Sequence, residues 1–101
     1  MSQSAPGEDY WKRADEVIQL ANEQRTHASN IKVGASLLYA AARFNAFVAA
    51  SSSADAAEMK ADKAEALEYF CDESRKALSE NLDDYVDHYE DYIEKFRNSR
   101  E

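Results

Sequence analysis

Apolar side chains recur every three or four residues along most of the chain, which is the spacing of one helix face. The first such stretch predicts a helix from about Asp9 to about Thr26. Residues 26–30 carry no apolar period and contain helix-capping side chains, so they predict a loop. A second helix is expected to begin between Asn30 and Ser36 and to run to Ala50, where three serines follow.

The second helix is apolar almost all round, a pattern typical of a central helix that other elements cover on several sides. Phe44 and Phe47 supply most of its large apolar surface, and its alanines allow neighbouring helices to approach closely. Its length approaches that of a membrane span. Lys32 and Arg43 interrupt it, however, so we expect a core helix and no membrane contact.

The remaining half of the chain keeps the helical spacing from Ala54 to Arg97 without a glycine or proline. One long helix satisfies this pattern. So does a helix broken at residues 79–81, where Asn81 would cap a fourth helix. The predicted fold is therefore an all-α bundle of three helices, the third long or broken near Asn81. A disordered tail over 1–7, one helical domain over 8–97 and a frayed end over 98–101 complete the expected organisation.

Helix lengths predict a surface that the chain cannot cover by itself. A helix over 54–97 would be about 65 Å long, whereas the second helix offers about 30 Å of partner. Seven large apolar residues lie beyond that reach: Leu82, Tyr85, Val86, Tyr89, Tyr92, Ile93 and Phe96. Either the chain folds back near residue 80 into a four-helix bundle, or this stretch packs on another subunit. The absence of glycine and proline favours self-association into a dimer or higher homo-oligomer.

Composition and charge narrow the class of protein further. Of the 101 residues, 45% are hydrophobic, enough for one core, while two glycines and one proline argue against an all-β fold. The net charge of -8 falls entirely in the second half, and Glu80–Glu94 holds seven acids without a lysine or arginine. Such a field repels phosphate backbones, so we expect no nucleic-acid partner.

The single cysteine, Cys71, excludes an intramolecular disulfide, as suits a reducing compartment. It lies between Leu67 and Leu78 on the apolar stripe and is predicted to be a small core residue. The first seven residues lack the basic and apolar regions of a secretory signal. The expected location is therefore cytoplasmic.

Both histidines follow a carboxylate at a spacing that places the two groups on one helix face. The pairs are Glu23 with His27 and Asp84 with His88, and they are candidate metal ligands. The alternative is a solvated or dipole-stabilising role, because Glu-x-x-His motifs of di-metal bundles are absent.

Tyr39 and Arg43 share a face of the second helix and are candidates for an anion or small-ligand site. The alternative is a structural ion pair of Arg43 with Asp15 or Glu65. The sequence has no glycine-rich phosphate loop, nucleophile triad or CxxC motif, so we expect no cofactor. The favoured function is a non-enzymatic helical module that self-associates and could dock a protein partner. A metal- or small-ligand-binding protein is the alternative.

Several segments resemble a family of small bacterial helical proteins described as a domain of unknown function. The similarity spans about residues 10–95 and is carried by five runs: Arg13–Glu16, Leu20–Gln24, Ser36–Ala50, Glu65–Phe70 and Asn81–Tyr85. This resemblance implies a bacterial origin and a helical fold, and it transfers no catalytic residue.

Overall fold

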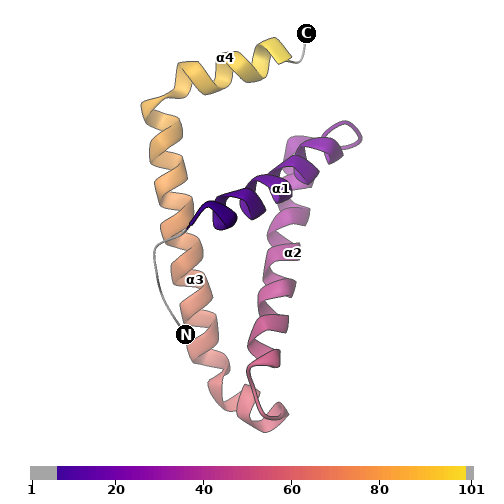
Figure 1. Ribbon diagram of the computed structural model, residues 1–101, viewed down its shortest axis with the longest axis vertical. Helices are drawn as coiled ribbons and strands as arrows, with labels where there is room; N and C mark the ends of the chain where they lie inside the picture. Colours follow the sequence, from indigo (N-terminus) through magenta and orange to yellow (C-terminus); the bar gives the residue numbers. More distant parts are fainter. Residues whose placement is uncertain (1–6, 100–101) are drawn as a thin grey trace. The chain divides into compact units, whose positions relative to one another are not determined.

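The computed structural model describes residues 7–99 and contains four helices and no strand in that range (Figure 1). They are α1 (Glu8–Gln24), α2 (Asn30–Ser51), α3 (Ala56–Asp87) and α4 (Tyr89–Ser99). The all-α prediction is confirmed. The expected disordered tail, apart from Gly7, and the last two residues of the expected frayed end lie outside the described residues. The chain divides into two units, Met1–Val48 and Ala49–Glu101. The prediction of a single domain over 8–97 stays a prediction.

In the first unit, side chains of the turn end α1 and start α2. Gly7 caps α1 with its backbone, and acidic Glu8 and Asp9 occupy the first turn, where the helix dipole favours them. At the other end, the Arg25 side chain donates to the side-chain oxygens of Asn22, at 3.0 Å, and Asn30, at 2.9 Å. The turn is thereby tied to the first residue of α2, and α1 ends two residues before the expected Thr26.

The α2 helix exposes most of its apolar surface. Val33 is the one buried hydrophobic residue among those described, whereas Leu38 is 72% exposed and Phe44 is 64% exposed. The Phe44 and Phe47 rings lie 5.7 Å apart, centroid to centroid. By length and composition alone, α2 would also suffice to cross a membrane. A helix of this kind needs a covering partner of some sort.

A carboxylate caps the start of α3 in the second unit. The Asp55 side chain accepts a hydrogen bond from the Glu58 backbone N–H at 2.9 Å. The Glu58 carboxylate accepts in turn from the Ala54 N–H at 3.4 Å, which gives a reciprocal cap close to the capping-box pattern. The helix therefore begins at Ala56, two residues later than predicted.

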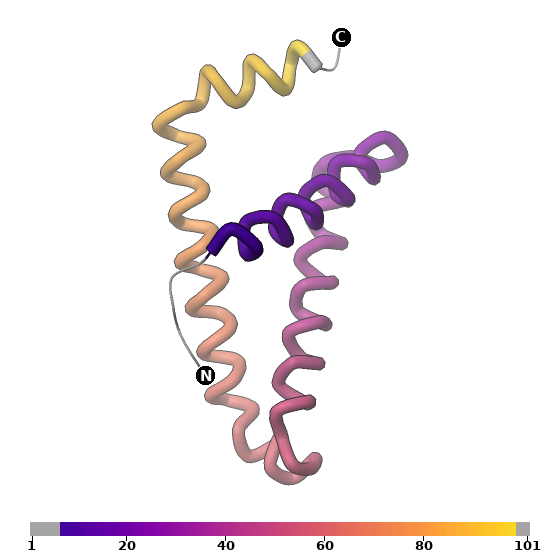
Figure 2. Tube along the Cα trace, viewed as in Figure 1, coloured from indigo at the N-terminus to yellow at the C-terminus, as the bar shows by residue number. Residues whose placement is uncertain are grey.

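Of the two alternatives left open for the third helix, the break near Asn81 is wrong, because α3 continues through residues 79–81 as one helix. The Asn81 side chain donates to the Ala77 carbonyl at 2.7 Å, so it bonds within the helix and caps nothing. The break lies at His88, where α4 turns away from the axis of α3 (Figure 2). Cys71, expected in the core, is exposed and unpaired in the middle of α3.

Candidate functional site

The bend between α3 and α4 is the most elaborate polar arrangement in the described part of the chain. His88 leaves helical geometry, with φ of -124° and ψ of 32°, yet its N–H still donates to the Asp84 carbonyl at 3.0 Å. Its own carbonyl accepts from the Tyr92 N–H at 3.1 Å, which starts α4 at once. Glu90 and Asp91 fill the first turn of α4, where negative charge is stabilised. The chain therefore changes direction at one residue without glycine or proline.

The carboxylate of Asp84 joins the two helices at this bend. Its Oδ2 accepts a hydrogen bond from the Tyr92 hydroxyl at 2.6 Å, the short distance typical of a charged acceptor. Its Oδ1 lies 3.2 Å from Nδ1 of His88. That nitrogen is also 3.2 Å from the Asp84 backbone carbonyl. One half-buried acid thus holds a side chain from the bend and another from α4.

Aromatic rings reinforce the same contact. Tyr85 and Tyr92 stack with ring centroids 4.3 Å apart and ring planes 26° from parallel. His88 meets Tyr92 nearly edge-on at 6.3 Å. Aromatic pairs of this geometry contribute about 0.5–1.5 kcal/mol beyond the area they bury. Stacking and the Asp84 hydrogen bond therefore act together to hold α4 against the end of α3.

Contacts at the bend raise the pKa values of two side chains, His88 and Tyr92. The pKa of His88 is raised above its usual 6.5, first because Nδ1 lies against the Asp84 carbonyl and also because the Asp84 carboxylate is negative. The pKa of Tyr92 is raised above 10.0, chiefly because its hydroxyl proton is shared with Asp84. In both cases the protonated form makes the better contact with Asp84.

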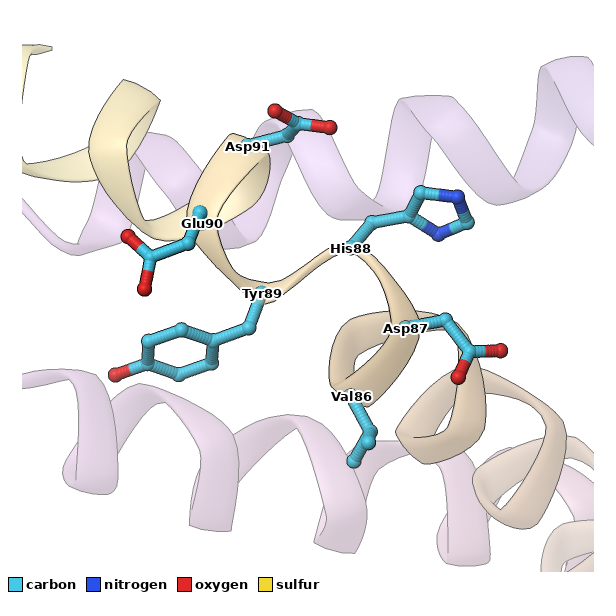
Figure 3. A pocket seen from close by; sticks show the side chains of 6 residues that line it. All are labelled: Val86, Asp87, His88, Tyr89, Glu90 and Asp91. Carbon is cyan, nitrogen blue, oxygen red and sulfur yellow. The ribbon is translucent and has the colours of Figure 1, made fainter.

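A shallow hollow of about 200 Å³ lies on this bend, lined by residues 86–91. Figure 3 shows that its side chains spread outward, with Tyr89 and Glu90 on one side and Asp87 and His88 on the other. They do not converge on a common point. Such a surface lacks the enclosing walls with which small-molecule sites bury a ligand.

The candidate metal ligands form two separate pairs. Asp84 and His88 are in contact, as their spacing predicts. Glu23 lies in the last turn of α1 and His27 in the turn that follows, both exposed and both in the other unit. Among residues 7–99, no group of three or more histidine, cysteine or acidic side chains is placed to hold a metal ion. Metal binding at these residues stays a prediction.

The candidate ligand residues Tyr39 and Arg43 are both exposed on α2. Because Arg43 is not buried, it does not need a carboxylate partner to offset desolvation. Ion pairs join Lys76 to Asp72 and Glu73, and His88 to Asp84, all on α3 or at its end. A role for Tyr39 and Arg43 in binding an anion stays a prediction.

The residues predicted for self-association line the end of α3 and all of α4. We call Leu82, Tyr85, Val86, Tyr89, Tyr92, Ile93 and Phe96 the C-terminal stripe. The first five are exposed, and Ile93 and Phe96 are half-buried. Sequence reasoning missed the hydrogen bond between Tyr92 and Asp84, because eight residues is not a spacing that brings side chains together on a continuous helix.

Comparison with known proteins gives two similarities. A family model described as Protein of unknown function (DUF3144) matches residues 10–86. That match ends before His88, so α4 lies outside it. The solution structure of the protein NB7890A from Shewanella sp. is 31% identical, with a TM-score of 0.72, over 91% of this chain and 98% of that one. Among curated proteins, no match was found.

Proposed function

The chain belongs to the family described as Protein of unknown function (DUF3144), and for this member we propose a non-enzymatic helical module that self-associates. In this proposal α1, α2 and α3 pack as a helical bundle, and the C-terminal stripe contacts the same stripe of a second copy. The observation that carries the proposal is the exposure of that stripe. Val86 is 74% exposed, Leu82 57% and Tyr89 50%.

Exposure of this kind favours a contact because each large apolar side chain gains about 1.5–3 kcal/mol on full burial. Scattered apolar residues on a surface need no explanation, but a contiguous row of seven is typical of an interaction site. Three of the seven are tyrosines. Tyrosine is enriched at protein interfaces, since its ring can be buried while its hydroxyl stays in water.

Helix lengths support a partner from outside the chain. The 22 residues of α2 make a rod of about 33 Å, and the 32 residues of α3 make one of about 48 Å. An antiparallel partner the length of α2 therefore runs out near Ala77. The stripe starts at Leu82, beyond that end.

Charge is arranged so that identical copies can meet at the stripe. Successive residues of a helix are rotated by about 100°, which puts the stripe on one side of each helix. The seven acids of the Glu80–Glu94 run fall on the opposite side: Glu80, Asp83, Asp84 and Asp87 on α3, and Glu90 and Asp91 with Glu94 on α4. By this rotation no acid falls within the stripe, so two copies can pack it without facing most of their like charges. Asp84, which accepts a hydrogen bond from Tyr92 of the stripe, is the acid that such a contact would bring nearest to the interface.

Sedimentation equilibrium of the full chain, from micromolar to millimolar concentration, tests the proposal. We expect reversible association that weakens in Tyr89→Gln, which places a polar group in the stripe. The matched control is Glu90→Gln, one residue away on the opposite side of α4, which should associate as the natural chain does. A full-length chain that remains a monomer throughout this range would overturn the proposal.

A second candidate function is metal binding, and the contact between Asp84 and His88 favours it. A metal ion bridging the two side chains would replace the contact between Asp84 Oδ1 and His88 Nδ1 and would need Nδ1 unprotonated, while Oδ2 could keep the Tyr92 hydroxyl. Calorimetric titration of the untagged chain with Zn²⁺ tests this function. Heat that vanishes in His88→Gln supports it, and the absence of saturable heat refutes it.

A further inference from the structure

The apolar residues on either side of the bend follow one uninterrupted heptad pattern. Starting at Leu78, the intervals alternate strictly between four and three through the following positions: Leu78, Leu82, Tyr85, Tyr89, Tyr92 and Phe96. A sustained 3.5-residue repeat is typical of a helix that packs along its whole length against another in a coiled coil. The bend at His88 lies inside this repeat, yet the phase is the same before and after it.

Such continuity is unexpected for two independent helices. A separate α4 could place its apolar face at any rotation about its own axis, and nothing would fix its phase to that of α3. One continuous helix, by contrast, requires the phase to be kept. The residues also allow continuity, since 54–97 contain neither glycine nor proline.

The contacts at the bend belong to the bent form alone. In a continuous helix, eight residues would separate the backbones of Asp84 and Tyr92 by about 12 Å along the axis, and seven would separate Tyr85 and Tyr92 by about 10 Å. The bent form has a hydrogen bond of 2.6 Å and a ring stack at 4.3 Å instead. In the bent form, the rings of two heptad residues, Tyr85 and Tyr92, therefore pack against each other. Their stacked faces are not accessible to a partner helix.

We propose that α3 and α4 straighten into one helix when the protein self-associates, with the heptad row packed against the same row of a second copy. The bent form is then the unassembled form, in which the Asp84–Tyr92 hydrogen bond and the Tyr85–Tyr92 stack hold α4 back. This inference rests on the proposed self-association. The two forms differ at His88, the residue that leaves helical geometry.

Straightening and assembly are linked equilibria. A second copy binds the continuous form better, because only that form presents all six heptad positions in line, and its binding shifts the population toward that form. Contacts that exist only in the bent form oppose assembly. Removing one of them, while keeping the heptad apolar, should tighten association.

Tyr92→Phe makes that change, since it removes the hydroxyl that donates to Asp84 and keeps the ring. A hydrogen bond of this kind contributes about 1 kcal/mol, and both copies lose it on assembly, so its removal predicts roughly thirtyfold tighter association in sedimentation equilibrium. Tyr89→Phe is the matched control, because it removes a hydroxyl from the next heptad position without touching Asp84; it should change the association constant little. Unchanged or weaker association of Tyr92→Phe would overturn the inference.

Distance measurement separates the inference from the function on which it rests. Spin labels at Glu73→Cys and Asn98→Cys, in a Cys71→Ser chain, lie on the polar side of the two helices. A continuous helix would place these backbones about 37 Å apart, at about 1.5 Å per residue, and the bent form places them closer. Labelled chains are diluted into unlabelled ones so that only distances within one chain are seen.

We expect the distance to lengthen toward the continuous value as concentration drives association. Association without lengthening would overturn the straightening and leave the self-association standing. A chain that neither associates nor lengthens would overturn both.

Discussion

Replacing Leu82 by alanine gives the most direct quantitative test of the C-terminal stripe. Fully burying a leucine side chain is worth about 1.5–3 kcal/mol. Since Leu82 is 57% exposed, a contact with a second copy can remove about half of the residue's surface from water, and this burial contributes about 1 kcal/mol. In a twofold contact the same residue is used by both copies, so the substitution acts twice. The dimer should therefore lose about 2 kcal/mol, which weakens the association constant about thirtyfold.

The control is Leu67→Ala, on the same helix and 61% exposed, but outside the stripe. Sedimentation equilibrium measures association, and circular dichroism in the dilute monomer checks that both variants remain helical. We expect Leu82→Ala to weaken association and Leu67→Ala to leave it within about threefold of the natural chain. Equal effects of the two substitutions would refute the assignment of the interface to the stripe.

Three further outcomes follow from the structure. Asp55→Ala removes the cap of α3 and should lower the free energy of unfolding by about 1 kcal/mol, which lowers the melting temperature by about 4–8 °C. The control Asp62→Ala, inside the helix, should not lower it. Equal melting temperatures of the two variants would contradict the capping role. Protonated His88 stabilises the bend, because its pKa is raised there; this contribution is complete below pH 6.5 and is lost as pH rises through the raised pKa. The nuclear Overhauser contact between Tyr85 and Tyr92 should therefore weaken as pH rises through this window, and a contact independent of pH would contradict the expectation. The sequence predicts that α2 is a core helix and does not contact a membrane, so the chain should not rise to the top of a gradient with phosphatidylglycerol–phosphatidylethanolamine vesicles. Co-flotation would contradict this prediction.

The helices could be predicted from sequence because their signal is local. Apolar spacing located α1 and α2 to within two residues or so at each end, and the start of α3 was off by two residues. For the last helix, one long helix and a break near Asn81 were both left open, and Asn81 was a candidate because an asparagine with two following acids matches the pattern of an N-cap. Its side chain instead bonds to the preceding turn, an option that the sequence does not distinguish from capping.

The bend could not be predicted because its causes are distant in sequence. The spacing of four indicated that Asp84 and His88 approach each other, and they do. The partners that hold the bend, Tyr85 and Asp84 with Tyr92, are seven and eight residues apart and meet only after the helix has turned. Helical periodicity assumes a straight helix axis, so it does not predict contacts that form only when the axis bends.

Net charge and charge pattern predict opposite behaviour for this chain, and the proposed association follows from the pattern. A charge of -8 on 101 residues disfavours contact between identical copies. With the acids on the side away from the stripe, however, two packed helices keep their acid-bearing sides apart by roughly two helix diameters, about 20 Å. Repulsion is screened over about 8 Å at physiological ionic strength. The acids therefore keep the outer faces solvated and oppose every association geometry except the one that joins the apolar rows.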